Sequence, residues 1–144
     1  MVQYHSIFSY ALPSLYVADT GAGVHLTNRE SIGNNTTKHG NLLELHTANG
    51  VIPSTEVTHS KLDNDFGELE FRVLDETPNV LSVGRIVRQQ RMHLAWGPDI
   101  PPHFITAQGV KIPLTVINDV PFFEKKFTDT VIKTISAVGL TDEQ

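Results

Sequence analysis

One short run of the sequence combines residue types that could do acid–base chemistry. Asp19-Thr20-Gly21-Ala22-Gly23 directly follows the apolar segment 15–18. An apolar strand would deliver the Asp19 carboxylate into a turn whose small residues leave it uncovered, and the glycines permit close approach of another backbone. A carboxylate presented in this way can act as a general acid or base.

Three interpretations of this run are open. In the first, two such carboxylates share one proton, so that one activates a water against a peptide carbonyl while the other polarises that carbonyl. In the second, the turn's amides cradle a phosphate, as in sugar kinases and actin-like ATPases, but those folds need more than twice 144 residues. The dinucleotide fingerprint also fails, because Leu26 stands where the third glycine belongs. In the third, Asp19 only caps backbone amides in a turn.

The elements that would position these residues are mostly short strands. Residues 67–74 alternate polar and apolar side chains, which predicts a half-buried strand with Leu69, Phe71 and Val73 on one face. Asn49-Gly50 is a two-residue hairpin signal between the apolar segments 42–47 and 51–52. Further expected elements are a strand at 92–96, a short helix at Gly84-Gln90, a hairpin at 104–114 around Gln108-Gly109, and a helix or strand at 127–138.

Composition narrows the class of protein. A length of 144 residues favours one domain. The absence of cysteine excludes disulfides and thiol nucleophiles, and a net charge of −5 argues against direct nucleic-acid binding. Neither a secretory leader nor a membrane-length apolar stretch is present, which predicts an intracellular soluble protein. The seven histidines form no metal-binding motif, although His46 and His59 could face each other across a hairpin, so we expect no metal and no cofactor.

Two further blocks give the chain a resemblance to a known family. Asp19-Thr20-Gly21-Ala22 resembles the active-site tetrad of the retropepsins, the aspartic proteases of retroviruses and retrotransposons, and the segment Val80-Leu81-Ser82-Val83-Gly84-Arg85-Ile86-Val87 resembles the block that closes their core. Gly84 follows Asp19 by 65 residues, about the separation which that fold requires. Ala48-Asn49-Gly50 and the segment 79–85 are similar to the protease region of copia-type (Ty1/copia) retrotransposon gag-pol polyproteins.

The resemblance implies an all-β fold, a retropepsin-like closed barrel with one short helix near Gly84-Gln90 and half of an active site per chain. It implies a protease core at 1–100 and a C-terminal extension at 101–144. Asp19 would be the catalytic carboxylate, Thr20 would brace the two active-site loops, Gly21 would place a carbonyl against the substrate, and Ala22 would complete the active-site loop. Ala48, Asn49 and Gly50 would form the flap, with Asp63-Asn64-Asp65 as the alternative turn, and Gly84 and Arg85 would be structural.

One departure from the family affects Arg85. Many retropepsins carry an aspartate just after the tetrad, and it pairs with the arginine of the closing block. Here Gly23 and Val24 occupy those positions, so Arg85 needs another partner.

The resemblance also implies a stoichiometry and an activity. None of the remaining aspartates is followed by Thr-Gly or Ser-Gly, so we expect a homodimer with two copies of Asp19 at its two-fold axis. The expected function is that of an aspartic endopeptidase acting on a polypeptide, in nature a retrotransposon polyprotein, in the cytoplasm or within a virus-like particle. No membrane and no direct nucleic-acid partner are expected. The alternative is a catalytically silent module of the same fold that serves dimerisation or peptide binding.

Overall fold

The computed structural model describes residues 14–33, 35–47 and 50–125. Ala48, Asn49 and the segment predicted as a helix or strand at 127–138 lie outside this range. Strands hold 59% of the described residues and helices 9%, which confirms the predicted all-β class. Among the described residues, no helix is both long enough and apolar enough to cross a membrane.

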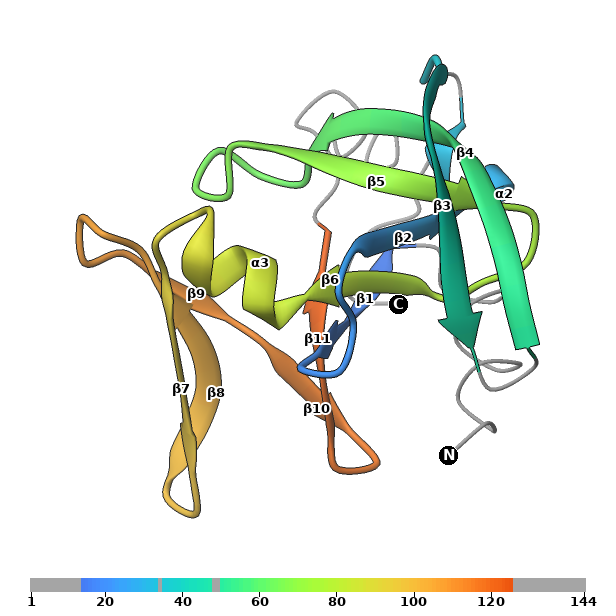
Figure 1. Ribbon diagram of the computed structural model, residues 1–144. Helices are drawn as coiled ribbons and strands as arrows, with labels where there is room; N and C mark the ends of the chain where they lie inside the picture. The colour runs from blue at the N-terminus through green and yellow to red at the C-terminus, as the bar shows by residue number, and fades with distance from the viewer. Residues whose placement is uncertain (1–13, 34, 48–49, 126–144) are drawn as a thin grey trace, which may run out of the picture.

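The larger of two sheets has eight strands in the order β10-β11-β1-β6-β2-β5-β4-β3 (Figure 1). Its strands are β1 (Leu15–Asp19), β2 (His25–Asn28), β3 (Lys38–Thr47), β4 (Gly50–Lys61), β5 (Glu68–Leu74), β6 (Asn79–Ser82), β10 (Thr115–Ile117) and β11 (Val120–Glu124). The alternation predicted for β5 is confirmed, because Leu69, Phe71 and Val73 are all buried. At the centre of the sheet, β1 pairs in parallel with β6, and β2 pairs in parallel with β5.

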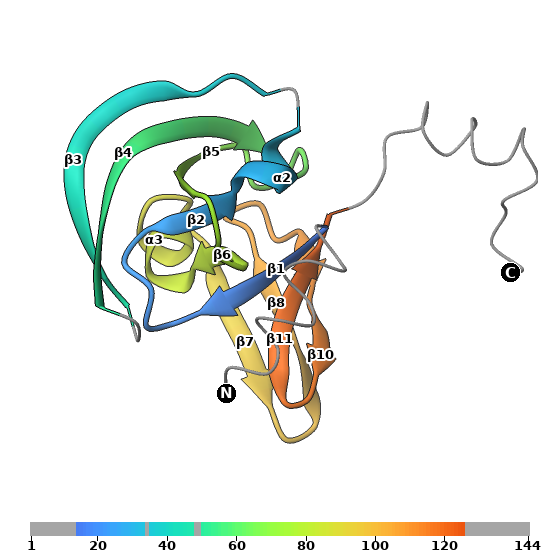
Figure 2. The same cartoon turned by 90° about the vertical axis from the view of Figure 1, so that its right-hand side faces the viewer.

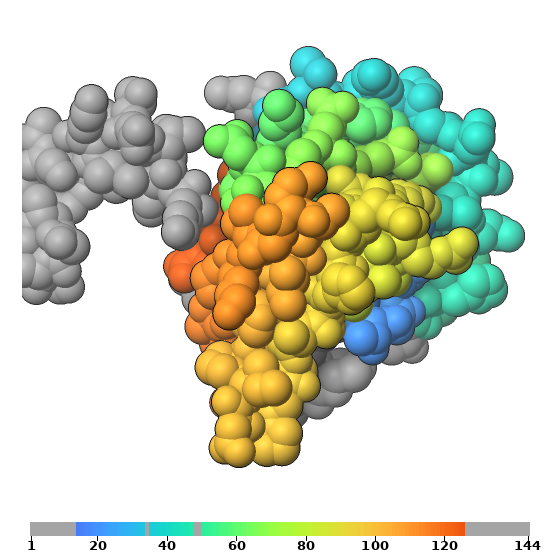
Figure 3. Space-filling view, turned by 90° about the vertical axis from the view of Figure 1, so that its left-hand side faces the viewer, coloured from blue at the N-terminus to red at the C-terminus, as the bar shows by residue number. Residues whose placement is uncertain are grey.

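The smaller sheet consists of β7 (His93–Gly97), β8 (Ile100–Ile105) and β9 (Lys111–Pro113). Figure 3 shows this sheet, in yellow to orange, on one face of the molecule, with the β7–β8 hairpin projecting beyond the main body. The strand predicted at 92–96 and the hairpin predicted at 104–114 are both found here.

Two short helices join the strands. The helix α3 (Val83–Arg88) confirms the one predicted near Gly84-Gln90, and it begins where the Ser82 side chain accepts a hydrogen bond from the Arg85 N–H. The helix α2 (Arg29–Ile32) was not predicted, and Asn28 caps it by accepting from the Ser31 N–H. An oxygen-bearing residue at this position satisfies an amide that has no partner within the helix.

The closed barrel implied by the resemblance is not found among the described strands. The larger sheet is open, with β10 at one edge and β3 at the other. Instead of closing the sheet, β3 and β4 form a long curved hairpin whose concave side faces the rest of the molecule (Figure 2).

The boundary expected after residue 100 does not separate a core from an extension. It falls at the first residue of β8, and β11 pairs antiparallel with β1, the strand that ends at Asp19. Phe104, Ile112, Leu114 and Phe123 are buried in the same cluster as the residues of the expected core. Residues 101–124 are therefore part of the fold. Pro101 and Pro102 lie within β8 at a register shift, where two residues of β8 face one residue of β7.

The proposed facing of His46 and His59 across the hairpin is wrong. His46 is paired with Val51, whereas His59 lies opposite Glu70 on the next strand, with its Nε2 3.5 Å from Glu70 Oε2. Within the described part of the chain, no group of three or more histidine or carboxylate side chains could hold a metal ion.

Candidate active site

Asp19 stands at the end of a buried strand, as its sequence context predicts. Residues 15–18 of β1 are all buried, Asp19 is half-buried, and Thr20 and Gly21 are exposed in the turn that follows. The Gly21 N–H donates to Asp19 Oδ1 over 2.7 Å. This bond holds the carboxylate in one orientation, and a Cβ at Gly21 would lie only 3.3 Å from the same oxygen. The turn therefore brings the backbone of Gly21 close to the carboxylate.

The loop after Asp19 is fastened to the block at 79–85. Parallel pairing of β1 with β6 places Asp19 opposite Ser82, which is 1% exposed. The Ser82 hydroxyl donates to the Ala22 carbonyl over 2.6 Å and accepts from the Arg85 N–H over 3.2 Å. One hydroxyl thus connects the candidate catalytic loop to the first turn of α3.

Arg85 finds its partner in the backbone of the same loop. Its Nε donates to the Gly23 carbonyl over 2.8 Å, so a main-chain oxygen takes the place of the carboxylate that many retropepsins offer. Gly84 is exposed, and a Cβ there would approach Ser82 Oγ only to 3.9 Å. The structure therefore supports a bracing role for Arg85 and gives no steric reason for glycine at position 84.

His25 is a second buried group behind the loop, and no feature of the sequence distinguishes it from the other six histidines. It is 2% exposed, and its Nδ1 accepts from the Ser82 N–H over 2.9 Å. Burial, reinforced by the positive charge of Arg85, lowers the pKa of His25 from 6.5 to about 4. The ring is therefore neutral near pH 7, with its proton on Nε2.

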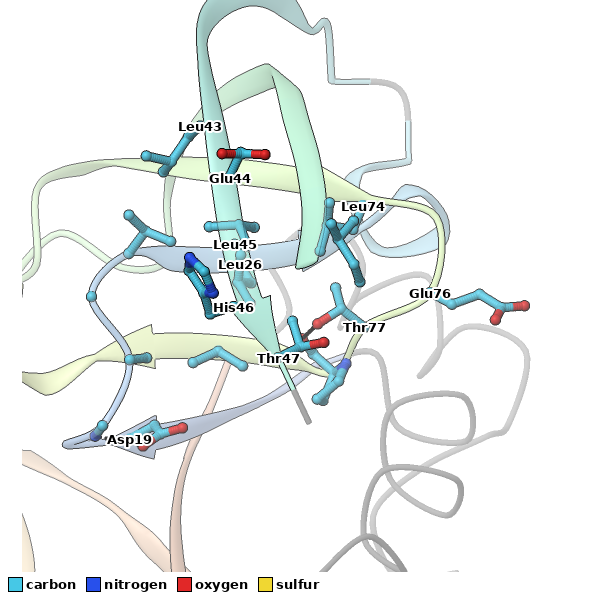
Figure 4. A pocket seen from close by; sticks show the side chains of 17 residues that line it. Asp19, Leu26, Leu43, Glu44, Leu45, His46, Thr47, Leu74, Glu76 and Thr77 are labelled. Atoms are coloured by element: carbon cyan, nitrogen blue, oxygen red, sulfur yellow. Dashed lines mark hydrogen bonds between the residues drawn. The ribbon is translucent and has the colours of Figure 1, made fainter. Parts of the chain in front are cut away.

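A cavity of about 500 Å³ lies between this loop and the β3–β4 hairpin (Figure 4). Asp19 and the small residues of its turn lie at one side of the cavity. The hairpin contributes Leu43, Leu45 and Ile52, and antiparallel pairing of Leu45 with Ile52 places these two on one face. The wall between them comes from the segment 74–80. The cavity thus has the Asp19 carboxylate on one side and apolar side chains of the hairpin on the other, and it is open to solvent.

The geometry separates the two turns considered for the flap. The hairpin that carries Asn49-Gly50 lines the cavity through both of its strands, and at its end Thr47 Oγ1 donates to the Gly50 carbonyl over 2.9 Å. Gly50 has a φ of 111°, a backbone conformation that residues other than glycine rarely adopt. The alternative turn at Asp63 is closed on itself, with Asp63 Oδ1 accepting from the N–H groups of Asp65 and Phe66, and it does not line the cavity.

The chemistry of the cavity is that of carboxylates beside apolar walls. Its titratable lining residues are Asp19, Glu44, His46 and Glu76, with no lysine or arginine among the described residues that line it. The sequence did not identify the wall at 74–80. For the hairpin, the sequence does contain a signal: Leu43 and Leu45 are two residues apart, which predicts that both lie on the same face of the strand.

Comparisons with protein-family models, with curated proteins and with solved structures find no match to this chain. Any assignment of function therefore rests on the residues and the geometry described above.

Proposed function

We propose that the protein is a retropepsin-like aspartic endopeptidase whose active site forms across a homodimer. The observation that carries this proposal is the placement of Asp19 on a braced loop, facing a cavity that the β3–β4 hairpin covers. Since each chain offers one Asp-Thr-Gly, two chains are needed for one pair of carboxylates. Thr20 is exposed in the turn, where its hydroxyl is accessible to the second chain's loop.

The chemistry follows from two carboxylates that share one proton. The ionised Asp19 takes a proton from a water while the water oxygen bonds to the peptide carbonyl carbon. The protonated Asp19 of the partner subunit donates to the carbonyl oxygen, which becomes a hydroxyl in the tetrahedral intermediate. Collapse of that intermediate transfers a proton to the amide nitrogen, breaks the C–N bond and restores the shared proton. The proton belongs to the pair rather than to either residue.

The cavity suits an extended polypeptide. A chain lying between the Asp19 loop and the hairpin can pair through its main chain and direct alternate side chains to opposite sides. The copia-type resemblance of the segments 48–50 and 79–85 supports a retrotransposon polyprotein as the natural substrate, cleaved in the cytoplasm or within a virus-like particle.

The decisive test is substitution of the carboxylate. We expect Asp19→Asn to abolish peptide cleavage while leaving the unfolding transition in place, because the amide keeps an oxygen for the Gly21 N–H but cannot act as the base. Asp119→Asn is the matched control, since Asp119 is exposed in a turn at a φ of 65° that asparagine tolerates. Activity per mole should also fall on dilution, because the dimer is the catalyst. Cleavage that survives Asp19→Asn would overturn the proposal.

The second candidate is a silent module of the same fold. The hydrogen bond from the Gly21 N–H to Asp19 Oδ1 favours it, because a carboxylate that caps a turn has a structural role without catalysis. A protein that dimerises and binds peptides, yet cleaves none with Asp19 intact, would have this function.

A further inference from the structure

The cavity beneath the hairpin continues into a second one. An adjoining space of about 580 Å³ lies under β4, and the two cavities share Ile52, Leu74 and Glu76 as lining residues. Figure 4 shows the Glu76 side chain at the edge of the first cavity, directed away from Asp19. The shared residues place the second cavity, which we call the outer cavity, next to the one that Asp19 lines.

The outer cavity carries an excess of negative charge. Its charged lining residues are Arg29, Glu56, Asp75 and Glu76. Arg29 is already paired, since its Nη2 lies 2.7 Å from Glu56 Oε1 and its Nε lies 3.1 Å from Asp75 Oδ1. Glu76 has no ion pair within the described part of the chain. Glu76 is exposed, so its carboxylate is solvated by water and is accessible to a cationic group of a bound molecule.

A buried hydroxyl in the same cavity points independently to a ligand. Ser54 is 2% exposed and lines the outer cavity, and its Oγ has no hydrogen-bond partner among the described residues. The register places Ser54 opposite Leu43, on the face of the hairpin that Ile52 also occupies. Since burying a hydroxyl without a partner costs free energy, a ligand that donates a hydrogen bond there would be stabilised.

We propose that the outer cavity is a subsite for a cationic side chain, lysine or arginine, of the polypeptide bound by the proposed protease. This inference rests on the proposed function for its ligand class. The apolar stem of such a side chain would pack on Ile52 and Leu74, and its N–H groups would face Glu76 and the Ser54 hydroxyl. Complementary charge of this kind gives specificity and a faster encounter.

The test measures peptide binding to the full chain carrying Asp19→Asn, so that nothing is cleaved. The probes are fluorescein-labelled decapeptides in which one lysine is moved along a neutral sequence, each matched by a peptide with norleucine at the same place. We expect lysine to be favoured at one position, about two- to fivefold at low salt, and the preference to shrink at high salt.

Added substitutions locate the subsite. Glu76→Gln should remove the preference for lysine over norleucine without weakening the norleucine peptide. Ser54→Ala should weaken the lysine peptide by about twofold and leave the norleucine peptide unchanged, because one hydrogen bond makes a modest net contribution. Glu124→Gln is the control, because it removes the same charge from an exposed position outside the described cavities. Equal binding of lysine and norleucine peptides at every position, or a preference that Glu76→Gln leaves intact, would overturn the inference.

Cleavage of the same peptides by the unsubstituted protein separates this inference from the proposed function. Cleavage without any lysine preference would leave the protease assignment standing and refute the subsite. A lysine preference that depends on Glu76, without cleavage, would support the subsite and refute the protease. If no peptide binds, both are refuted.

Discussion

His25 offers the sharpest test of how the candidate active-site loop is held. Its ring is buried behind Ser82, accepts the Ser82 N–H at Nδ1 and lies against Phe71 with ring centroids 5.4 Å apart. Burial and the charge of Arg85 lower its pKa from 6.5 to about 4 in the folded protein. Protonation would place a hydrogen on Nδ1, so the ring could no longer accept from Ser82.

The size of the effect follows from the two pKa values. As the pH falls below about 6.5, the unfolded chain binds a proton at His25 that the folded chain refuses until about pH 4. The unfolded state therefore holds more protons in this window, and the free energy of unfolding decreases on acidification. The gap between the pKa values corresponds to a loss of about 3 kcal/mol, a large part of the stability of a small domain.

The variant His25→Asn isolates this contribution. Asparagine offers an oxygen near the position of Nδ1 but does not titrate, so its stability should lack the His25 component of the pH dependence. Urea unfolding from about pH 7 to about pH 4 would measure the difference between the variant and the unsubstituted protein at each pH. We expect this difference to shift by about 3 kcal/mol in favour of the variant at the acidic end.

Subtracting the two proteins removes the contributions of all other titrating groups, including Glu56, whose pKa is lowered mainly by its hydrogen bond from Arg29. The control is His93→Asn, because His93 is exposed. A stability difference between His25→Asn and the unsubstituted protein that stays constant across the pH range would refute the reasoning.

Two further substitutions test the packing around the site by urea unfolding near neutral pH. Ser82→Ala removes both the hydrogen bond to the Ala22 carbonyl and the cap of α3, so we expect the free energy of unfolding to fall by about 2 kcal/mol. The control is Ser60→Ala, since Ser60 is half-buried. A decrease for Ser82→Ala no larger than that for Ser60→Ala would contradict this prediction. Gly40→Ala would place a Cβ 2.9 Å from Val57 Cγ1, so we expect the free energy of unfolding to fall by about 1–3 kcal/mol. The control is Gly23→Ala, whose Cβ would meet no atom within 4 Å. Equal stability of the two variants would contradict the close packing of β3 against β4.

Local patterns predicted the elements that carry the site. The alternation in residues 67–74 identifies β5, and the apolar run before Asp19 identifies β1. The Asn49-Gly50 signal identifies the long hairpin, in which Gly50 is the first residue of β4 and pairs with Thr47. These features are readable because each depends on neighbours in the sequence. A period of two or a two-residue turn is set within a few residues.

The arrangement of those elements could not be read in the same way. The parallel pairing of β1 with β6 joins residues about sixty positions apart, and no local pattern encodes it. The partner of Arg85 is a backbone carbonyl. Because every residue has one, the residue types in the sequence cannot predict this partner. By contrast, the turn at Asn118-Asp119, with both residues at positive φ, was a hairpin signal that the sequence contained and that was not used.

The pKa of His25 also bears on where the proposed protease can work. A dyad that must hold one proton favours acidic conditions, whereas protonation of His25 near pH 4 removes the Ser82 hydrogen bond behind the Asp19 loop. At high pH, activity should fall because the dyad loses its shared proton. At low pH, activity should fall both because the dyad becomes fully protonated and because the Asp19 loop loses the support of the Ser82 hydrogen bond. We therefore expect His25→Asn to retain cleavage to lower pH than the unsubstituted protein, when both are assayed above the dimer dissociation constant. Acidic limbs that coincide would show that the dyad alone sets the lower limit and that His25 does not govern the loop.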